Sequence, residues 1–162
     1  MTTPDADHQR LQRLLDLVNR EDEHLLAVRE RFLGDDCSVD VNRLEHLLAD
    51  DLGIDRLESF GAKFARMQDT IVDKLIPVLL RVLGEQPGAA IDNLNRMERL
   101  ELIATADEWL AMRRLRNRLV HEYIDRPDDL APARERACRF TTRMHEDFVA
   151  MREYAERRVQ RA

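Results

Sequence analysis

Apolar residues recur along most of this chain at spacings of three and four, the repeat of an α-helix that buries one face. We expect a first helix over about residues 7–33 and a short second helix over about residues 40–50. Between them, residues 34–38 combine glycine with short polar residues, which favour turns. The first helix carries an apolar stripe formed by Leu11, Leu14, Leu15, Val18, Leu25, Val28 and Phe32.

The clearest pattern lies in a third predicted helix over about residues 57–82, where every step between apolar positions is three or four. Its stripe is formed by Leu57, Phe60, Phe64, Met67, Ile71, Leu75, Val78 and Val82. Pro77 lies within this helix and has no N–H for the carbonyl of the preceding turn. We therefore expect a kink near residues 73–76. Residues 84–88, which include two glycines and a proline, end the helix.

Three further helical segments complete the chain. A short one covers about residues 90–104, and Thr105 with Glu108 forms a capping box that starts the next helix, which we expect to reach about Tyr123. The last helix covers about residues 130–161, with an apolar stripe formed by Phe140, Met144, Phe148, Met151 and Ala155. The pattern predicts one all-α domain over residues 1–162, an antiparallel helical bundle of about four long helices plus short ones.

The composition supports a helical fold and changes the picture of its partners. Apolar residues make up 44% and charged residues 36%, and there are only five glycines and five prolines. The net charge of −6 argues against a non-specific nucleic-acid binder, which is normally basic. Against this balance, four cations cluster within six residues: Arg113, Arg114, Arg116 and Arg118.

Cysteine usage and the N-terminus bear on location. Cys37 and Cys138 are 101 positions apart without a C-x-x-C motif, so we expect two buried thiols, no disulfide and a reducing compartment. The acidic start of the chain lacks the apolar core of a signal peptide. The longest charge-free run in the third helix has six residues, too few for a bilayer span. We expect a soluble, cytoplasmic protein without a membrane partner.

The candidate chemistry lies in residues 116–123, near the end of the fifth predicted helix. Arg113, Asn117 and His121 form one row at spacing four, and Arg116 and Tyr123 form a neighbouring row. On an ideal helix, His121 lies about 140° around the axis from Arg116. Three arrangements bring both to one ligand. The Arg116 side chain reaches around the helix, or the helix ends near His121, or a second copy of the chain completes the site.

Each of these residues also has an ordinary structural interpretation. Arg113, Arg114 and Arg118 fit a solvated basic face, or weak surface pairs with Glu108 and Glu122. Tyr123 fits a half-buried core phenol. His24 and His145 fit surface positions in charged rows. Asn117 is harder to explain in this way, because asparagine disfavours the middle of a helix.

Arg116 followed after four residues by His121 and then by Tyr123, with Asn117 directly after the arginine, resembles the signature of HEPN domains. It is most similar to the HepT-like toxins of HEPN/MNT toxin–antitoxin pairs. The resemblance covers mainly residues 57–148 and places a motif-bearing core at about 54–160. Residues 1–50 match it weakly, and their role is unassigned.

The resemblance implies a metal-independent endoribonuclease that needs no cofactor and acts on RNA as a homodimer, with both motifs in one cleft. His121 would be the general acid or base, Arg116 would bind the scissile phosphate, and Asn117 would orient the phosphate or His121. Arg113, Arg114 and Arg118 would add phosphate contacts. Tyr123 would line the cleft and accept a nucleotide from a cognate nucleotidyltransferase antitoxin. The alternative is a non-catalytic HEPN-like subunit that binds a nucleotide or the nucleotidyltransferase partner.

Overall fold

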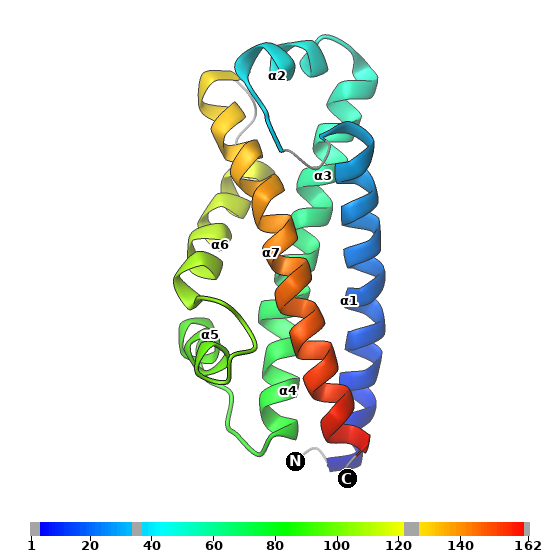
Figure 1. Ribbon diagram of the computed structural model, residues 1–162, viewed down its shortest axis with the longest axis vertical. Coiled ribbons are helices and arrows are strands. Elements are labelled where there is room, and N and C mark those ends of the chain that lie inside the picture. The colour runs from blue at the N-terminus through cyan, green and yellow to red at the C-terminus, as the bar shows by residue number, and fades with distance from the viewer. Residues whose placement is uncertain (1–3, 34–36, 122–126, 161–162) are drawn as a thin grey trace.

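The structure is a computed structural model that describes residues 4–33, 37–121 and 127–160. The regular elements in these ranges are helices, and they form an antiparallel bundle (Figure 1), which confirms the predicted fold class. The elements are α1 (Pro4–Phe32), α2 (Val41–Leu48), α3 (Asp51–Thr70), the π-helical turn η1 (Ile71–Leu75), α4 (Ile76–Val82), α5 (Ala90–Arg99), α6 (Ala106–His121) and α7 (Pro127–Gln160).

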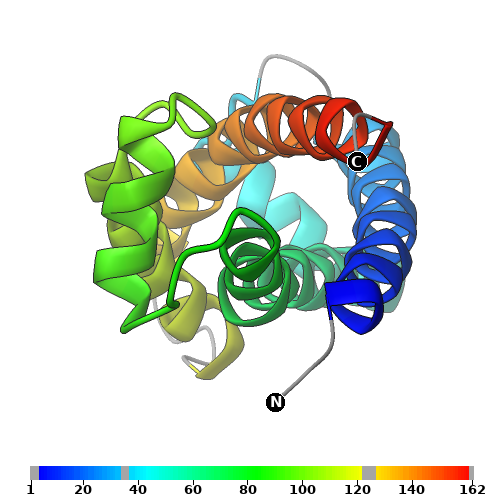
Figure 2. The ribbon, with the colours of Figure 1, turned by 90° about the horizontal axis from the view of Figure 1, so that it is seen from below.

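Four columns make up the bundle and alternate in direction. α1 runs up, the continuous column α3–η1–α4 runs down, α6 runs up, and α7 returns (Figure 1). α5 lies across the bundle axis below α6, and α2 caps the opposite end. Seen along the axis, α1, α3–α4 and α7 enclose the interior, with α5 and α6 stacked on one side (Figure 2). The N-terminal helix, to which the sequence assigns no role, is therefore one column of the bundle.

The predicted apolar stripes face the interior. Of the third-helix stripe, all residues from Leu57 to Val78 are buried, and Val82 is half-buried. Four aromatic rings connect α3, α6 and α7, with centroid separations of 6.0 Å between Phe60 and Phe64, 6.3 Å between Phe64 and Phe140, and 5.3 Å between Trp109 and Phe140. The Trp109 and Phe140 rings meet edge to face, a favoured aromatic geometry.

The helix is irregular before Pro77, where we predicted a kink, and the irregularity is a π-helical turn. The predicted position, residues 73–76, overlaps the π-helical turn, and the N–H of Ile76 donates to the carbonyl of Ile71, five residues back. Because proline cannot donate, the hydrogen bonds of the preceding turn are rearranged. Two successive steps of four in the stripe, Met67 to Ile71 to Leu75, fit this wider turn, and all three residues stay buried.

The other helix ends follow local sequence signals. The N–H of Glu108 donates to Thr105 Oγ1 at 3.2 Å, so Thr105 caps α6 as predicted. α5 ends earlier than expected, at Arg99, because Glu101 has a φ of 59°. α7 begins at Pro127 and not near residue 130, because proline suits the first position of a helix.

The two cysteines require a correction. Cys37 and Cys138 are joined by a disulfide, with a Cα–Cα separation of 5.5 Å. Both are buried, as predicted, yet the prediction of free thiols was wrong, and the argument for a reducing compartment loses its basis. The pairing depends on the return of α7 beside the segment between α1 and α2, which no local pattern reveals. In the described ranges, no helix is both long and apolar enough to span a bilayer.

Candidate functional site

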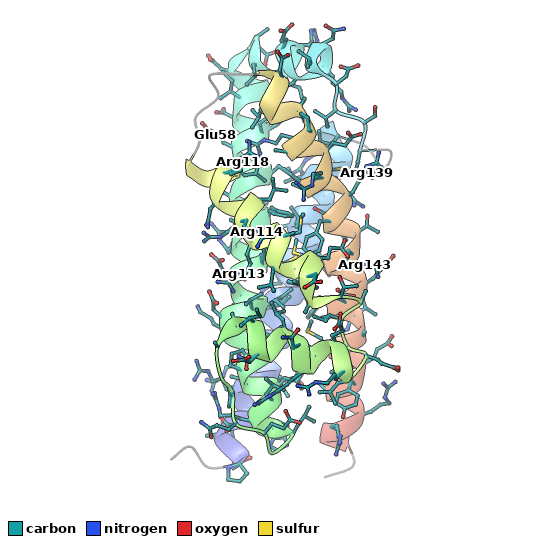
Figure 3. All side chains as sticks on the ribbon, turned by 90° about the vertical axis from the view of Figure 1, so that its left-hand side faces the viewer. Glu58, Arg113, Arg114, Arg118, Arg139 and Arg143 are labelled. Atoms are coloured by element: carbon teal, nitrogen blue, oxygen red, sulfur yellow. A yellow bond between two sulfur atoms is a disulfide. The ribbon has the colours of Figure 1, made fainter. Side chains whose placement is uncertain are left out.

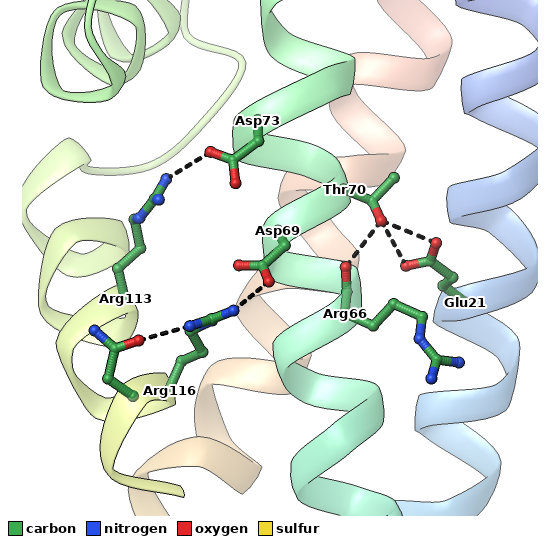
Figure 4. Close-up of polar contacts among 8 residues, drawn as sticks. Glu21, Arg66, Asp69, Thr70, Asp73, Arg113 and Arg116 are labelled. Atoms are coloured by element: carbon green, nitrogen blue, oxygen red, sulfur yellow. Dashed lines mark hydrogen bonds and ion pairs between the residues drawn. The ribbon is translucent and has the colours of Figure 1, made fainter. Parts of the chain in front are cut away.

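Helix α6 carries the candidate residues and has two different faces. Its apolar positions, spaced three and four apart, point into the core; they are Trp109, Met112, Leu115 and Leu119. The positions between them carry Arg113 and Arg116, whose side chains reach α3–η1 (Figure 4), and the exposed Asn117. The burial of the first face therefore sets the direction of the second.

The Arg116 guanidinium is held by two acceptors. Its Nη2 forms an ion pair with Asp69 Oδ2 on α3, and its Nη1 donates to Asn117 Oδ1 at 2.6 Å (Figure 4). The side chain is 26% exposed, so it remains open to a ligand. A guanidinium fixed in this way matches the planar geometry of a carboxylate or a phosphate. The structure thus brings the predicted Arg116 and Asn117 together.

The second ion pair corrects an expectation about Arg113. Its Nη1 lies 3.2 Å from Asp73 Oδ1 on η1, whereas the sequence suggested Glu108 or Glu122 as partners. Asp69 and Asp73 thus form two ion pairs that connect α3–η1 to α6. Sequence reasoning missed both aspartates. The available signal was their spacing of four, which places them on one face of the third predicted helix.

The remaining arginines of the run lie on one side of the molecule. Arg113, Arg114 and Arg118 follow α6, and Arg139 and Arg143 lie beside them on α7 (Figure 3). Arg114 and Arg118 are exposed, which agrees with a solvated basic face. Arg139 pairs with Glu135 on its own helix. The role of Arg113, Arg114 and Arg118 in phosphate binding stays a prediction.

The structure describes little of the other two predicted site residues, His121 and Tyr123. His121 is the last described residue of α6, so the three expected arrangements stay predictions. The structure does not describe the His121 side chain. Tyr123 and Glu122 lie outside the described residues.

An open pocket of ≈ 400 Å³ lies beside Arg116 on the outer face of α3. Its lining combines two small residues with charged and polar ones: Ala62, Ala65, Arg66, Asp69, Thr70, Asp73, Lys74 and Arg116. On the α1 side, Thr70 Oγ1 donates to Glu21 Oε1 at 3.0 Å (Figure 4). Burial raises the pKa of Glu21 above its ordinary value, and the nearby Asp69 adds to this, while the Thr70 hydrogen bond opposes it.

Arg134, which the sequence did not single out, is buried under the C-terminal part of α6. It is 3% exposed, and its Nη1 donates to the carbonyl of Leu57 at 3.0 Å. Gly61 makes room for it, because a Cβ there would lie 3.0 Å from Nη1 and 3.7 Å from the carbonyl oxygen of Leu119. Burial lowers the pKa of Arg134 to about 10, against the effect of Glu58. The one sequence signal was a glycine inside a helical stripe.

The His145 side chain is 41% exposed, in line with its expected surface position, but it has a partner that the sequence did not indicate. Its Nδ1 lies 2.6 Å from Asp22 Oδ2, which connects α7 to α1. Asp22 is only 5% exposed, and burial raises its pKa above the ordinary value, against the His145 hydrogen bond. Further contacts between the same two helices join Arg29 to Thr142 and Arg152 to Asn19, each at 2.6 Å. His145 therefore contributes to helix packing, whereas His24 is exposed, as predicted.

Two further observations bear on the function: the grouping of possible metal ligands, and the similarity of the chain to known proteins. Over the described part of the chain, no three His, Cys, Asp or Glu side chains are grouped so that they could hold a metal ion. Comparisons with protein-family models, with curated proteins and with solved structures found no match to this chain. The resemblance to HEPN domains therefore rests on the residues of the motif alone.

Proposed function

We propose that this protein is a HEPN-type, metal-independent endoribonuclease that acts on RNA as a homodimer. The observation that carries the proposal is the Arg116 guanidinium, held by Asp69 and Asn117 beside an open pocket, five residues before His121 at the end of α6. A fixed cation and an imidazole supply phosphate binding and proton transfer, the two requirements for RNA cleavage without a metal.

In the proposed reaction, His121 accepts the proton of a ribose 2′-OH, whose oxygen attacks the adjacent phosphorus, or it protonates the 5′ oxygen that leaves. A homodimer would supply two copies of His121 and so both proton-transfer roles at one cleft. Arg116 would stabilise the charge that gathers on the phosphate oxygens, and it must exchange Asp69 for phosphate to do so. Asn117 would keep the guanidinium plane oriented.

Regulation follows from the same charges. A cognate nucleotidyltransferase antitoxin that attaches a nucleotide to Tyr123 would place a phosphate two residues beyond His121 and close to Arg116 in sequence. That phosphate would compete with RNA for the guanidinium.

Cellular RNA as substrate requires the cytoplasm. There the Cys37–Cys138 disulfide would be shielded by burial, since thiol–disulfide exchange needs access to sulfur.

Expression of the chain in bacteria tests this proposal. The wild-type protein is expected to arrest growth and fragment cellular RNA, and His121→Ala is expected to do neither. His24→Ala is the matched control, because His24 is exposed and lies on α1. Growth arrest and RNA fragmentation by His121→Ala at the wild-type level would end the nuclease assignment.

The second candidate is a non-catalytic subunit that binds a nucleotide or a nucleotidyltransferase partner. The Arg116–Asp69 ion pair and the net charge of −6 favour it, because both oppose the approach of RNA. It predicts normal growth on expression and a stable complex with the nucleotidyltransferase on size-exclusion chromatography. Growth arrest that depends on His121 would exclude it.

A further inference from the structure

The pocket beside Arg116 extends across the outer face of α3, beyond the residues of the motif. Three cations and two carboxylates line it; they are Arg66, Lys74, Arg116, Asp69 and Asp73. The local sum is +1, from three positive and two negative side chains, while the whole chain carries −6. The pocket is therefore a locally cationic place on an acidic protein, and local potential governs the approach of anions.

The carboxylates near this pocket are already engaged. Asp69 pairs with Arg116, Asp73 pairs with Arg113, and Glu21 accepts the Thr70 hydroxyl. Arg66 and Lys74 are exposed and form no hydrogen bond or ion pair with another described side chain, although both act electrostatically on Glu21. These two cations therefore determine the charge that an incoming anion meets.

The π-helical turn improves the alignment of these two cations. Arg66 and Lys74 are eight residues apart, which on an uninterrupted α-helix separates them by about 80° around the axis and about 12 Å along it. The turn η1, at Ile71–Leu75, has a wider hydrogen-bond repeat and reduces this angle. Both residues line one pocket together with Asp69 and Arg116. Turns of this kind occur often at functional sites.

We propose that this pocket binds backbone phosphates of the RNA strand that flank the bond to be cut, with Arg66 and Lys74 as the phosphate-binding side chains. The inference rests on the proposed nuclease function and extends it from one phosphate at Arg116 to a strand path across α3. The alanine floor, Ala62 and Ala65, leaves room for the backbone of the strand.

Binding of a fluorescent single-stranded RNA tests the pocket. The measurement uses fluorescence anisotropy at several salt concentrations, with the full chain carrying His121→Ala so that the RNA stays intact. In this background, Arg66→Ala/Lys74→Ala is compared with Arg56→Ala/Lys63→Ala, which removes one arginine and one lysine of α3 outside the pocket. The pocket variant is expected to bind roughly tenfold more weakly than the control.

The salt dependence identifies the lost contacts as phosphate contacts. The slope of log affinity against log salt should fall by about 0.7 for each phosphate contact removed from a single strand, and the control should keep the parent slope. With His121 restored, the pocket variant should raise KM and leave kcat unchanged, because the flanking phosphates contribute equally to ground-state and transition-state binding. These results would support the strand path.

Three outcomes would overturn the strand path, and they differ in whether they also exclude the proposed nuclease function. If the pocket variant binds RNA as the control does while Arg116→Ala binds weakly, the strand path is wrong and the proposed function stands. If the pocket variant loses binding of ATP but not of RNA, the site takes a free nucleotide. If neither the wild type nor the His121→Ala parent binds RNA, the strand path and the proposed function both fail.

Discussion

The two faces of α6 are held by opposite kinds of interaction. Towards the core, Trp109 is fully buried against Phe140, and its Nε1 donates to Asp147 Oδ2 at 2.8 Å. Towards α3, Arg113 and Arg116 form ion pairs whose members are a quarter to a half exposed. Apolar burial contributes several kcal/mol for a large side chain, whereas exposed ion pairs contribute roughly 0–1 kcal/mol.

This difference explains how one helix serves two purposes. The core face holds α6 in place without help from its charges. The ion pairs on the other face are therefore free to exchange a carboxylate for a phosphate at little cost in stability. The comparison predicts that substitutions on the core face unfold the protein, and that substitutions on the α3 face change activity alone.

Trp109→Ala should have the largest effect on stability. It removes a buried ring and one of the donors to Asp147, so the free energy of unfolding should fall by roughly 3–5 kcal/mol, measured by urea denaturation. Trp109→Phe keeps most of the ring and should cost less. If Trp109→Ala lowers the free energy of unfolding no more than Arg113→Ala does, the two faces do not differ in the way described.

Reduction of the Cys37–Cys138 disulfide should come next. The bond joins residues 101 positions apart, and its loss should lower the free energy of unfolding by roughly 2–4 kcal/mol, because the unfolded chain regains freedom. The measurement is the melting temperature with and without dithiothreitol. Cys37→Ala/Cys138→Ala is the control and should not respond to the reductant. Wild-type protein that is reduced while unfolded, refolded in dithiothreitol, and still melts at the temperature of the oxidised protein would contradict the pairing.

Arg134→Met tests the junction of α3, α6 and α7. It removes the hydrogen bond from the buried guanidinium to the Leu57 carbonyl and should cost roughly 1–3 kcal/mol of unfolding free energy. Arg134→Lys should recover part of this, and Arg136→Met, an exposed position on the same helix, should cost much less. Equal losses for Arg134→Met and Arg136→Met would show that the buried guanidinium does not support the end of α6.

The stability of the core face should depend on pH through Asp147, the acceptor for Trp109. Burial raises the pKa of Asp147 above its ordinary value, against the effect of the Trp109 hydrogen bond. The folded protein therefore holds this proton more firmly than the unfolded chain, and the stability from Asp147 falls as pH rises through the raised pKa. Denaturation between pH 4.5 and pH 7.5 should show Asp147→Asn gaining stability relative to wild type as pH rises. A pH-independent difference would contradict this.

Arg116 should have the smallest effect on stability and a large effect on activity. Arg116→Ala should change the unfolding free energy by less than about 1 kcal/mol and lower kcat by roughly 10²–10³-fold. The charge exchange Arg116→Asp/Asp69→Arg restores an ion pair between α6 and α3 without restoring the guanidinium to its place. Recovery of RNA cleavage in the exchanged variant would show that Arg116 is a structural residue only.

The periodic features of the fold follow from the sequence, whereas the polar contacts do not. The third-helix stripe, the Thr105 cap and the irregularity before Pro77 depend on neighbours within a few residues, so local patterns predict them. The disulfide, the Asp69 and Asp73 partners and the burial of Arg134 each depend on contacts between distant helices. An arginine that becomes buried at a helix junction looks the same in sequence as the many arginines that remain in solvent.

The central claim is that Arg116 and His121 cut RNA without a metal ion. The most direct test is cleavage of a labelled RNA by purified protein in excess EDTA, with thermal melting to show that each variant is folded. Wild type should cleave, and folded His121→Ala should be at least roughly 10²-fold slower. Absence of cleavage by the wild type, or equal rates for the two proteins, would contradict the claim.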